Sequence, residues 1–228
     1  MSADGYFTRG FFEFLKELSS HNKREWFQAN KERYEKQARD PFLRLIADLG
    51  PGLKKINSRF VADPRPNGGS MMRIHRDIRF SKDKSPYKTF MAAHFWHANG
   101  KDEATPAYYL RLEPGGSVIG AGIWRPEPAA LKGIRDRIAR QPKEWQRITS
   151  GRPLGSGCRM IGESLARAPA GYDPNHPLVE DLKRKDFALS SPLTQSDVCR
   201  SDFLDLVLDN FRSTAPFVQF LSRAVGLR

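Results

Sequence analysis

Residues 71–90 gather basic side chains suited to binding an anion. These twenty positions contain six basic residues, Arg73, Arg76, Arg79, Lys82, Lys84 and Lys88, and two acidic ones, Asp77 and Asp83. The net charge of +4 is a third of the chain's formal +12. Guanidinium and ammonium groups bind phosphate and carboxylate through charge-assisted hydrogen bonds, which are stronger than neutral ones. The stretch therefore predicts a site for an anionic ligand.

The first half of the stretch predicts a half-buried β-strand, because apolar and polar residues alternate. One face would carry Met72, Ile74, Ile78 and Phe80, interrupted by Arg76, and the other Arg73, His75, Asp77, Arg79 and Ser81. From Ser81 to Lys88 the alternation stops, and Ser85-Pro86 is typical of a loop. The pattern thus predicts a charged strand that leads into a lysine-rich loop.

Two interpretations of this strand remain open. In the structural one, Asp77 neutralises Arg73 and Arg79 in a salt-bridge ladder. In the functional one, the two arginines form a fork for an anion, and Asp77 orients them or acts as a general base. The loop lysines have no acidic complement beyond Asp83, which favours the functional interpretation. The predicted anion-binding residues are Arg73, Arg79, Lys82, Lys84 and Lys88, supported by His75, Arg76, Asp77, Ser81, Asp83 and Tyr87.

Arg76 is a separate case, because the strand pattern places it on the apolar face. An unpaired buried charge is very costly. The pattern therefore predicts a carboxylate partner from outside the sheet, Glu25 or Glu32.

Several of these motifs resemble one family. The segment from Arg73 to Thr89 resembles the signature of the conserved hypothetical proteins grouped as domain of unknown function 2461. Three further pieces agree with it: Trp26-Phe27 with Asn30-Lys31 and Tyr34, Gly120-Ala121-Gly122 with the proline-rich helix start that follows, and Ala215-Pro216-Phe217. The resemblance covers nearly the whole chain. It implies no particular reaction, because the family carries no established activity to transfer.

The composition favours anionic partners and no membrane span. Basic residues number 38 against 26 acidic ones, and the isoelectric point is about 9.9. Such an excess favours contact with anions, namely nucleic acid, phosphorylated metabolites or anionic lipid. The alternative is a protein that is basic without any such partner. No run approaches the ~18 apolar residues that cross a bilayer. Cys158 and Cys199 stand far apart, which fits a reducing compartment. We expect a cytoplasmic protein without a disulfide; the sequence indicates no oligomeric state.

Neither histidines nor glycines form a cofactor motif. His94 and His97 would point to opposite faces of a strand and could not share a metal. Gly120 and Gly122 lack the third glycine and following helix of a dinucleotide-binding motif, and we expect them to let another element approach the sheet closely. We therefore expect no metal and no cofactor.

The order of patterns predicts an α+β fold. Strand patterns cover 72–80, 90–97, 108–112 and 118–124, and their short connections favour antiparallel pairing. We expect an antiparallel sheet of about four or more strands, with N-terminal and C-terminal helices packed on it. The single domain 1–228 would be helical over 1–57, sheet over 70–125 and helical over 126–228. Asn22 is expected to begin the second helix, with Glu25 reaching back in a capping box.

Three functions fit these features. The first is a site for a phosphate-bearing or other anionic ligand on residues 73–88, which requires a concave pocket if the ligand is small. The second is nucleic-acid binding through the same stretch and the helix at 125–147, which requires a basic stripe with exposed aromatic residues. The third is a structural or partner-binding protein without a ligand site. The residues indicate no particular catalysed reaction.

Overall fold

The protein has an α+β fold around one antiparallel sheet. The computed structural model describes residues 5–100, 105–150 and 157–227. Within them the sheet has five strands in the order β1-β2-β3-β5-β4. Their bounds are β1 Met91–Phe95, β2 Ala107–Leu112, β3 Val118–Ile123, β4 Arg159–Ile161 and β5 Phe187–Pro192. All neighbouring strands pair antiparallel, so the predicted fold class is confirmed.

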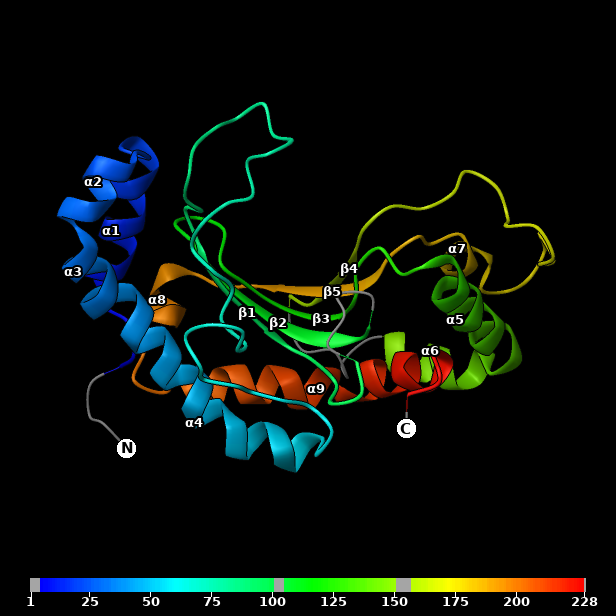
Figure 1. Ribbon diagram of the computed structural model, residues 1–228. Coiled ribbons are helices and arrows are strands. Elements are labelled where there is room, and N and C mark those ends of the chain that lie inside the picture. The colour runs from blue at the N-terminus through cyan, green and yellow to red at the C-terminus, as the bar shows by residue number, and fades with distance from the viewer. Residues whose placement is uncertain (1–4, 101–104, 151–156, 228) are drawn as a thin grey trace.

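Helices precede and follow the first three strands. The N-terminal group is α1 Arg9–Ser20, α2 Arg24–Ala29, α3 Lys31–Tyr34, a π-helical turn Glu35–Arg39, and α4 Asp40–Ile56. The later group is α5 Pro128–Arg140, α6 Pro142–Thr149, α7 Val179–Leu182, α8 Gln195–Val198 and α9 Phe203–Ala224. Figure 1 shows α4, α6 and α9 on one side of the sheet. No helix in the part of the chain that the structure describes is long and apolar enough to cross a membrane.

The core lies between the sheet and α9. Phe95 and Tyr108 are opposite each other on β1 and β2. Their rings lie 5.4 Å and 4.6 Å from the ring of Phe211 on α9. On β3, Gly122 has a φ of +122°, and a Cβ there would lie 2.9 Å from the Phe217 ring and 2.1 Å from the Phe187 oxygen. The predicted role of this glycine, close approach of another element, is therefore confirmed.

The segment 126–228, predicted as helical, contains two strands, β4 and β5, that its sequence pattern does not predict. The sequence of β5, Phe-Ala-Leu-Ser-Ser-Pro, has no β-branched residue and so lacks the usual local strand signal. It forms a strand because β3 and β4 pair with it on either side. The three residues of β4 lie within residues 150–177, a stretch rich in glycine, proline and alanine that predicts irregular structure.

The predicted strand 72–80 is also wrong. Residues 71–90 form a projecting arm, hereafter the basic arm, that holds only the isolated bridges Met71 to Ala93 and His75 to Tyr87. Figure 1 shows the arm rising from the sheet on the side away from α9. Charged residues on both sides of the segment leave it too little apolar surface to be packed as a strand of the sheet.

We expect the chain to unfold in one cooperative transition. The late strand β5 pairs with β3, and α9 packs across the sheet, so neither end can unfold without exposing the shared core. Calorimetry should give one peak with equal calorimetric and van't Hoff enthalpies. Two separated transitions, or a stable proteolytic fragment ending near residue 125, would contradict this.

Candidate anion-binding site

The basic arm is anchored to the free edge of β1. The Met72 amide donates to the Ala92 oxygen at 2.8 Å, and the His94 amide donates to the Ser70 oxygen at 2.9 Å. Further out, the Lys88 amide donates to the Ile74 oxygen at 2.8 Å, and the Arg76 amide to the Pro86 oxygen at 2.9 Å. These bonds form an irregular antiparallel ladder whose turn centres near residue 81. The arm therefore has a base, residues 71–76 and 86–90, and a tip, residues 78–84.

A side chain from the N-terminal helices holds the base. Asn22 donates from Nδ2 to the Tyr87 oxygen at 2.9 Å and accepts from the Tyr87 amide at 3.0 Å. The Tyr87 ring stacks on Phe27 with centroids 4.1 Å apart, and the His75 ring lies 5.1 Å from Tyr87. The predicted capping role of Asn22 is wrong, since α2 begins at Arg24 and its capping residue is Lys23. Its side-chain amide instead bonds to the Tyr87 backbone as a neighbouring β-strand would.

The two acids of the arm are occupied by two of its arginines. Arg79 binds Asp77 in a bidentate pair, with Nη2 to Oδ2 at 2.6 Å and Nε to Oδ1 at 3.0 Å. Arg76 pairs with Asp83, which also accepts from the hydroxyl of Ser85 at 2.6 Å and its amide at 2.9 Å. These hydrogen bonds, from Ser85 first and then Arg76, hold the pKa of Asp83 well below its usual range. Both acids therefore remain charged at neutral pH.

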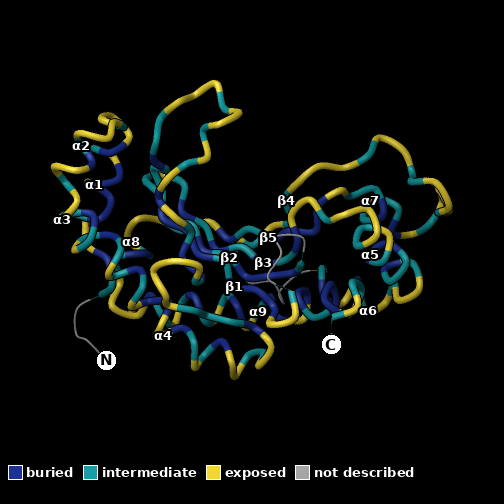
Figure 2. Tube along the Cα trace, in the orientation of Figure 1, coloured by how far each residue is buried: buried dark blue, intermediate teal, exposed yellow. Residues whose placement is uncertain are grey.

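Two predictions about the strand faces are wrong. The ion-pair partner of Arg76 is Asp83, within the arm, rather than Glu25 or Glu32. Phe80, predicted to face the core, is 95% exposed at the tip, and Figure 2 shows the tip mainly in the exposed colour. Only Ile74 of the predicted apolar face is buried. The alternation of apolar and polar residues did not produce a strand, because no other described element packs against the apolar side chains of the arm beyond its base.

The remaining predicted cations fall into two groups. At the base, Lys88 donates to the Arg73 oxygen at 2.9 Å. At the tip, Lys84 donates to the Ile78 oxygen at 2.9 Å, next to Arg79 and the exposed Lys82. The structure thus spreads the predicted cations along the arm rather than collecting them around one point. Of the other supporting residues, Ser81 lies at the tip, while His75 and Tyr87 belong to the aromatic contact at the base.

Arg73 and Lys82 are exposed and form no ion pair with any residue that the structure describes. Among the described residues, the hydrogen-bond partner of Lys84 is the Ile78 carbonyl, which accepts a hydrogen bond without neutralising the charge. The salt-bridge ladder is therefore partial: Asp77 forms a hydrogen-bonded pair with Arg79, whereas Arg73 acts on Asp77 only through its charge. The arm keeps positive charge that can attract an anion.

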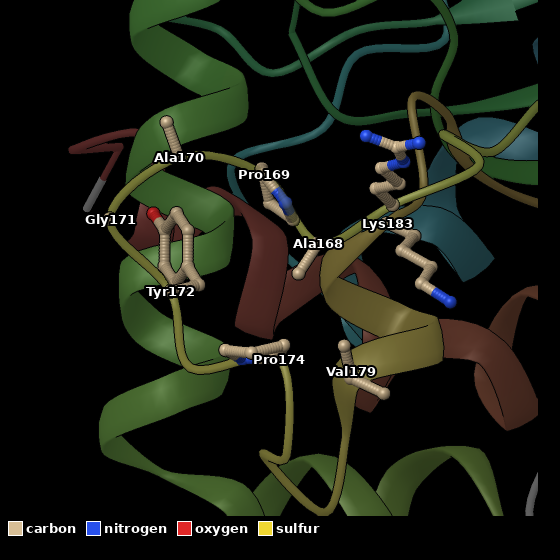
Figure 3. Close-up of a pocket in the computed structure, with 9 residues that line it drawn as sticks. Ala168, Pro169, Ala170, Gly171, Tyr172, Pro174, Val179 and Lys183 are labelled. Carbon is tan, nitrogen blue, oxygen red and sulfur yellow. The ribbon is translucent and has the colours of Figure 1, made fainter.

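A pocket lies elsewhere in the molecule. It has a volume of about 470 Å³ and is lined by residues 167–183, among them Tyr172, Pro174, Val179 and Lys183. Figure 3 shows Tyr172 on one side of it, with Pro174 and Val179 on another. Tyr172 donates to Asp136 at 2.7 Å, and Lys183 pairs with Glu180. None of the predicted anion-binding residues lines this pocket.

Metal-ligating and thiol groups do not gather at the arm. Residues 5–100, 105–150 and 157–227 contain no group of three or more His, Cys, Asp or Glu side chains that could hold a metal. His97 is buried against Phe60, with ring centroids 5.5 Å apart. Cys158 and Cys199 are free thiols. The chemistry available at the arm is thus ionic and aromatic.

The comparisons with known proteins place most of the chain in one family. The model of the family described as conserved hypothetical protein, DUF2461, matches residues 10–220. The chain belongs to this family. A search of curated proteins gives no match. The DUF2461 match spans α1 to α9 and includes the basic arm, so the arm is part of the region that defines the family.

Replacing Asn22 with alanine should loosen the arm. The change leaves the Tyr87 amide and carbonyl without partners in a partly buried setting, at a cost of about 1–3 kcal/mol. Urea denaturation should show this loss, and hydrogen exchange should accelerate in residues 72–76 and 86–90. Asn67→Ala, in an exposed loop, is the control. Equal stability of the two variants would contradict the role of Asn22 in holding the arm through the Tyr87 backbone.

Proposed function

We propose that the basic arm binds a phosphate-bearing ligand. The observation that carries this proposal is the division of charge within the arm. Asp77 and Asp83 are engaged by Arg79 and Arg76, whereas Arg73 and Lys82 have no ion pair among the described residues. An exposed cation without a hydrogen-bonded ion pair among the described residues contributes little to folding. It is available to bind an anion from solution.

Phosphate suits these groups better than a single carboxylate. Its oxygens accept several charge-assisted hydrogen bonds at once, and it carries more charge than a carboxylate. Arg73 offers a planar fork of donors, and Lys82 and Lys84 offer compact point charges. Asp77 and Asp83 keep the two paired arginines in place, which fixes the direction of the tip. These two acids would therefore act as positioning residues rather than ligands.

Replacing Lys82 with glutamine should weaken binding and leave the fold intact. We expect affinity for tripolyphosphate, measured by calorimetry, to fall about tenfold, because a lost charged hydrogen bond costs about 1.5 kcal/mol or more. The free energy of unfolding should not change, since Lys82 is exposed and pairs with no described residue. Lys143→Gln, an equal charge change on α6 at the other end of the molecule, is the control.

The proposal also predicts a thermal shift. A ligand that binds only the folded state raises its melting temperature. Tripolyphosphate should therefore stabilise the wild type and Lys143→Gln, and Lys82→Gln to a smaller extent. If the ligand stabilises none of them, or all of them equally, the arm is not the phosphate site.

A further inference from the structure

The sheet presents a polar row on the face turned away from α9. The strand registers place His94 opposite Tyr109, and Tyr109 opposite Gly120. Gly120 lies opposite Ser190, and Ser190 opposite Arg159. Directly opposed residues share a face of the sheet, so these five positions form one row across all five strands. With strands about 4.8 Å apart, the row is roughly 19 Å long.

This row differs from its neighbour on the core face. Phe95, Tyr108, Ala121 and Leu189 form the adjacent row, and all four are buried. In the polar row, the first four members are half-buried and Arg159 is exposed. Gly120 has no side chain beside Tyr109; a Cβ there would lie 3.4 Å from the Tyr109 Cβ. An imidazole, a phenol, a hydroxyl and a guanidinium therefore lie on the face that the core helices leave uncovered.

The base of the basic arm adjoins this face. The Arg111 guanidinium, on β2 two residues beyond Tyr109, lies 3.9 Å from the centroid of the Phe90 ring. Lys88 Nζ lies 5.9 Å from the same ring. Arg111 is opposite Ala92 in the register, two residues along the chain from Phe90 at the base of the arm. The Phe90 ring thus contacts a cation from the arm and a cation from the sheet, Arg111, whose guanidinium also pairs with Glu113.

We propose that the phosphate-bearing ligand is a single-stranded nucleic acid. The inference rests on the proposed phosphate site and adds the recognition of bases. An extended polyanion matches cations that are spread along an arm, whereas one compact phosphate meets only one group of them. Aromatic side chains stack on unpaired bases, and polar side chains of a sheet face bond to base edges. Phe80 at the tip and Tyr109 on the sheet are the stacking residues.

Two other polyanions fit less well. Bases in a duplex are stacked inside the helix, where neither Phe80 nor Tyr109 can reach a base face. An anionic membrane would need a broad apolar surface beside the cations. Phe80 and Trp124 are the large apolar residues that the described chain exposes, and the tip around Phe80 is charged. A lone aromatic residue suits a base better than a bilayer.

The test compares a single strand with a polyphosphate of similar charge and with a duplex of about twice that charge. Fluorescence anisotropy would measure binding of a labelled fifteen-nucleotide single strand, with a fifteen-unit polyphosphate and a fifteen-base-pair duplex as competitors. We expect the wild type to prefer the single strand to both. Phe80→Ala should weaken single-strand binding by about fivefold or more, the usual effect of losing one stacked base. Phe80→Trp should restore it, and polyphosphate binding should be unchanged in both variants.

Tyr109→Leu supplies an independent check on the sheet. It keeps a strand-compatible apolar side chain but removes the stacking ring, so single-strand affinity should fall while the melting temperature stays near that of the wild type. If polyphosphate and single strand bind equally, and neither Phe80→Ala nor Tyr109→Leu changes binding, the ligand is a simple polyanion: this inference fails and the phosphate site stands. If nothing binds, both fail. Preference for duplex, or Phe80-dependent binding to phosphatidylserine vesicles alone, also overturns it.

Discussion

The bidentate contact between Asn22 and the backbone of Tyr87 is the constraint on which the site depends. Within the described residues the arm has no sheet neighbour beyond β1, and its own ladder consists of a few irregular hydrogen bonds. Isolated two-stranded ribbons are marginal in water. The side-chain amide of Asn22 forms the two backbone hydrogen bonds that a neighbouring strand would otherwise form with Tyr87. The Phe27 ring stacks on the Tyr87 ring. The N-terminal helices therefore hold the arm in place while its tip remains exposed.

The charged side chains of the arm also help to hold its shape. Each acid lies within a few residues of the arginine it binds, so Asp77 and Asp83 shape the turn locally. Exposed ion pairs contribute little to stability, and their effect here is to fix direction. Arg73 at the base and Lys82 at the tip are the cations of the arm that are exposed and have no ion pair among the described residues. The shape of the arm and its surplus positive charge thus come from the same short segment.

Local patterns in the sequence predicted the fold class, the strands β1 to β3 and the charge of the arm. They failed where a distant partner decides the outcome. The alternation at 72–80 is real, but a strand also needs a layer to cover its apolar face, and Phe80 has none. The strand β5 lacks local signal and forms through β3 and β4. The polar row from His94 to Arg159 joins residues of five strands, so only the register reveals it. Asn22 was likewise assigned to a cap because its partner is 65 residues away.

Lysine footprinting tests the central claim most directly. An amine-acylating reagent would be applied to the native protein with and without a saturating single strand or polyphosphate, and the modification of each lysine measured by mass spectrometry. The account predicts that Lys82, Lys84 and Lys88 become protected while Lys54 and Lys143, exposed elsewhere on the molecule, react as before. Unchanged reactivity of the three arm lysines, in the presence of a ligand that binds, would show that the basic arm is not the site.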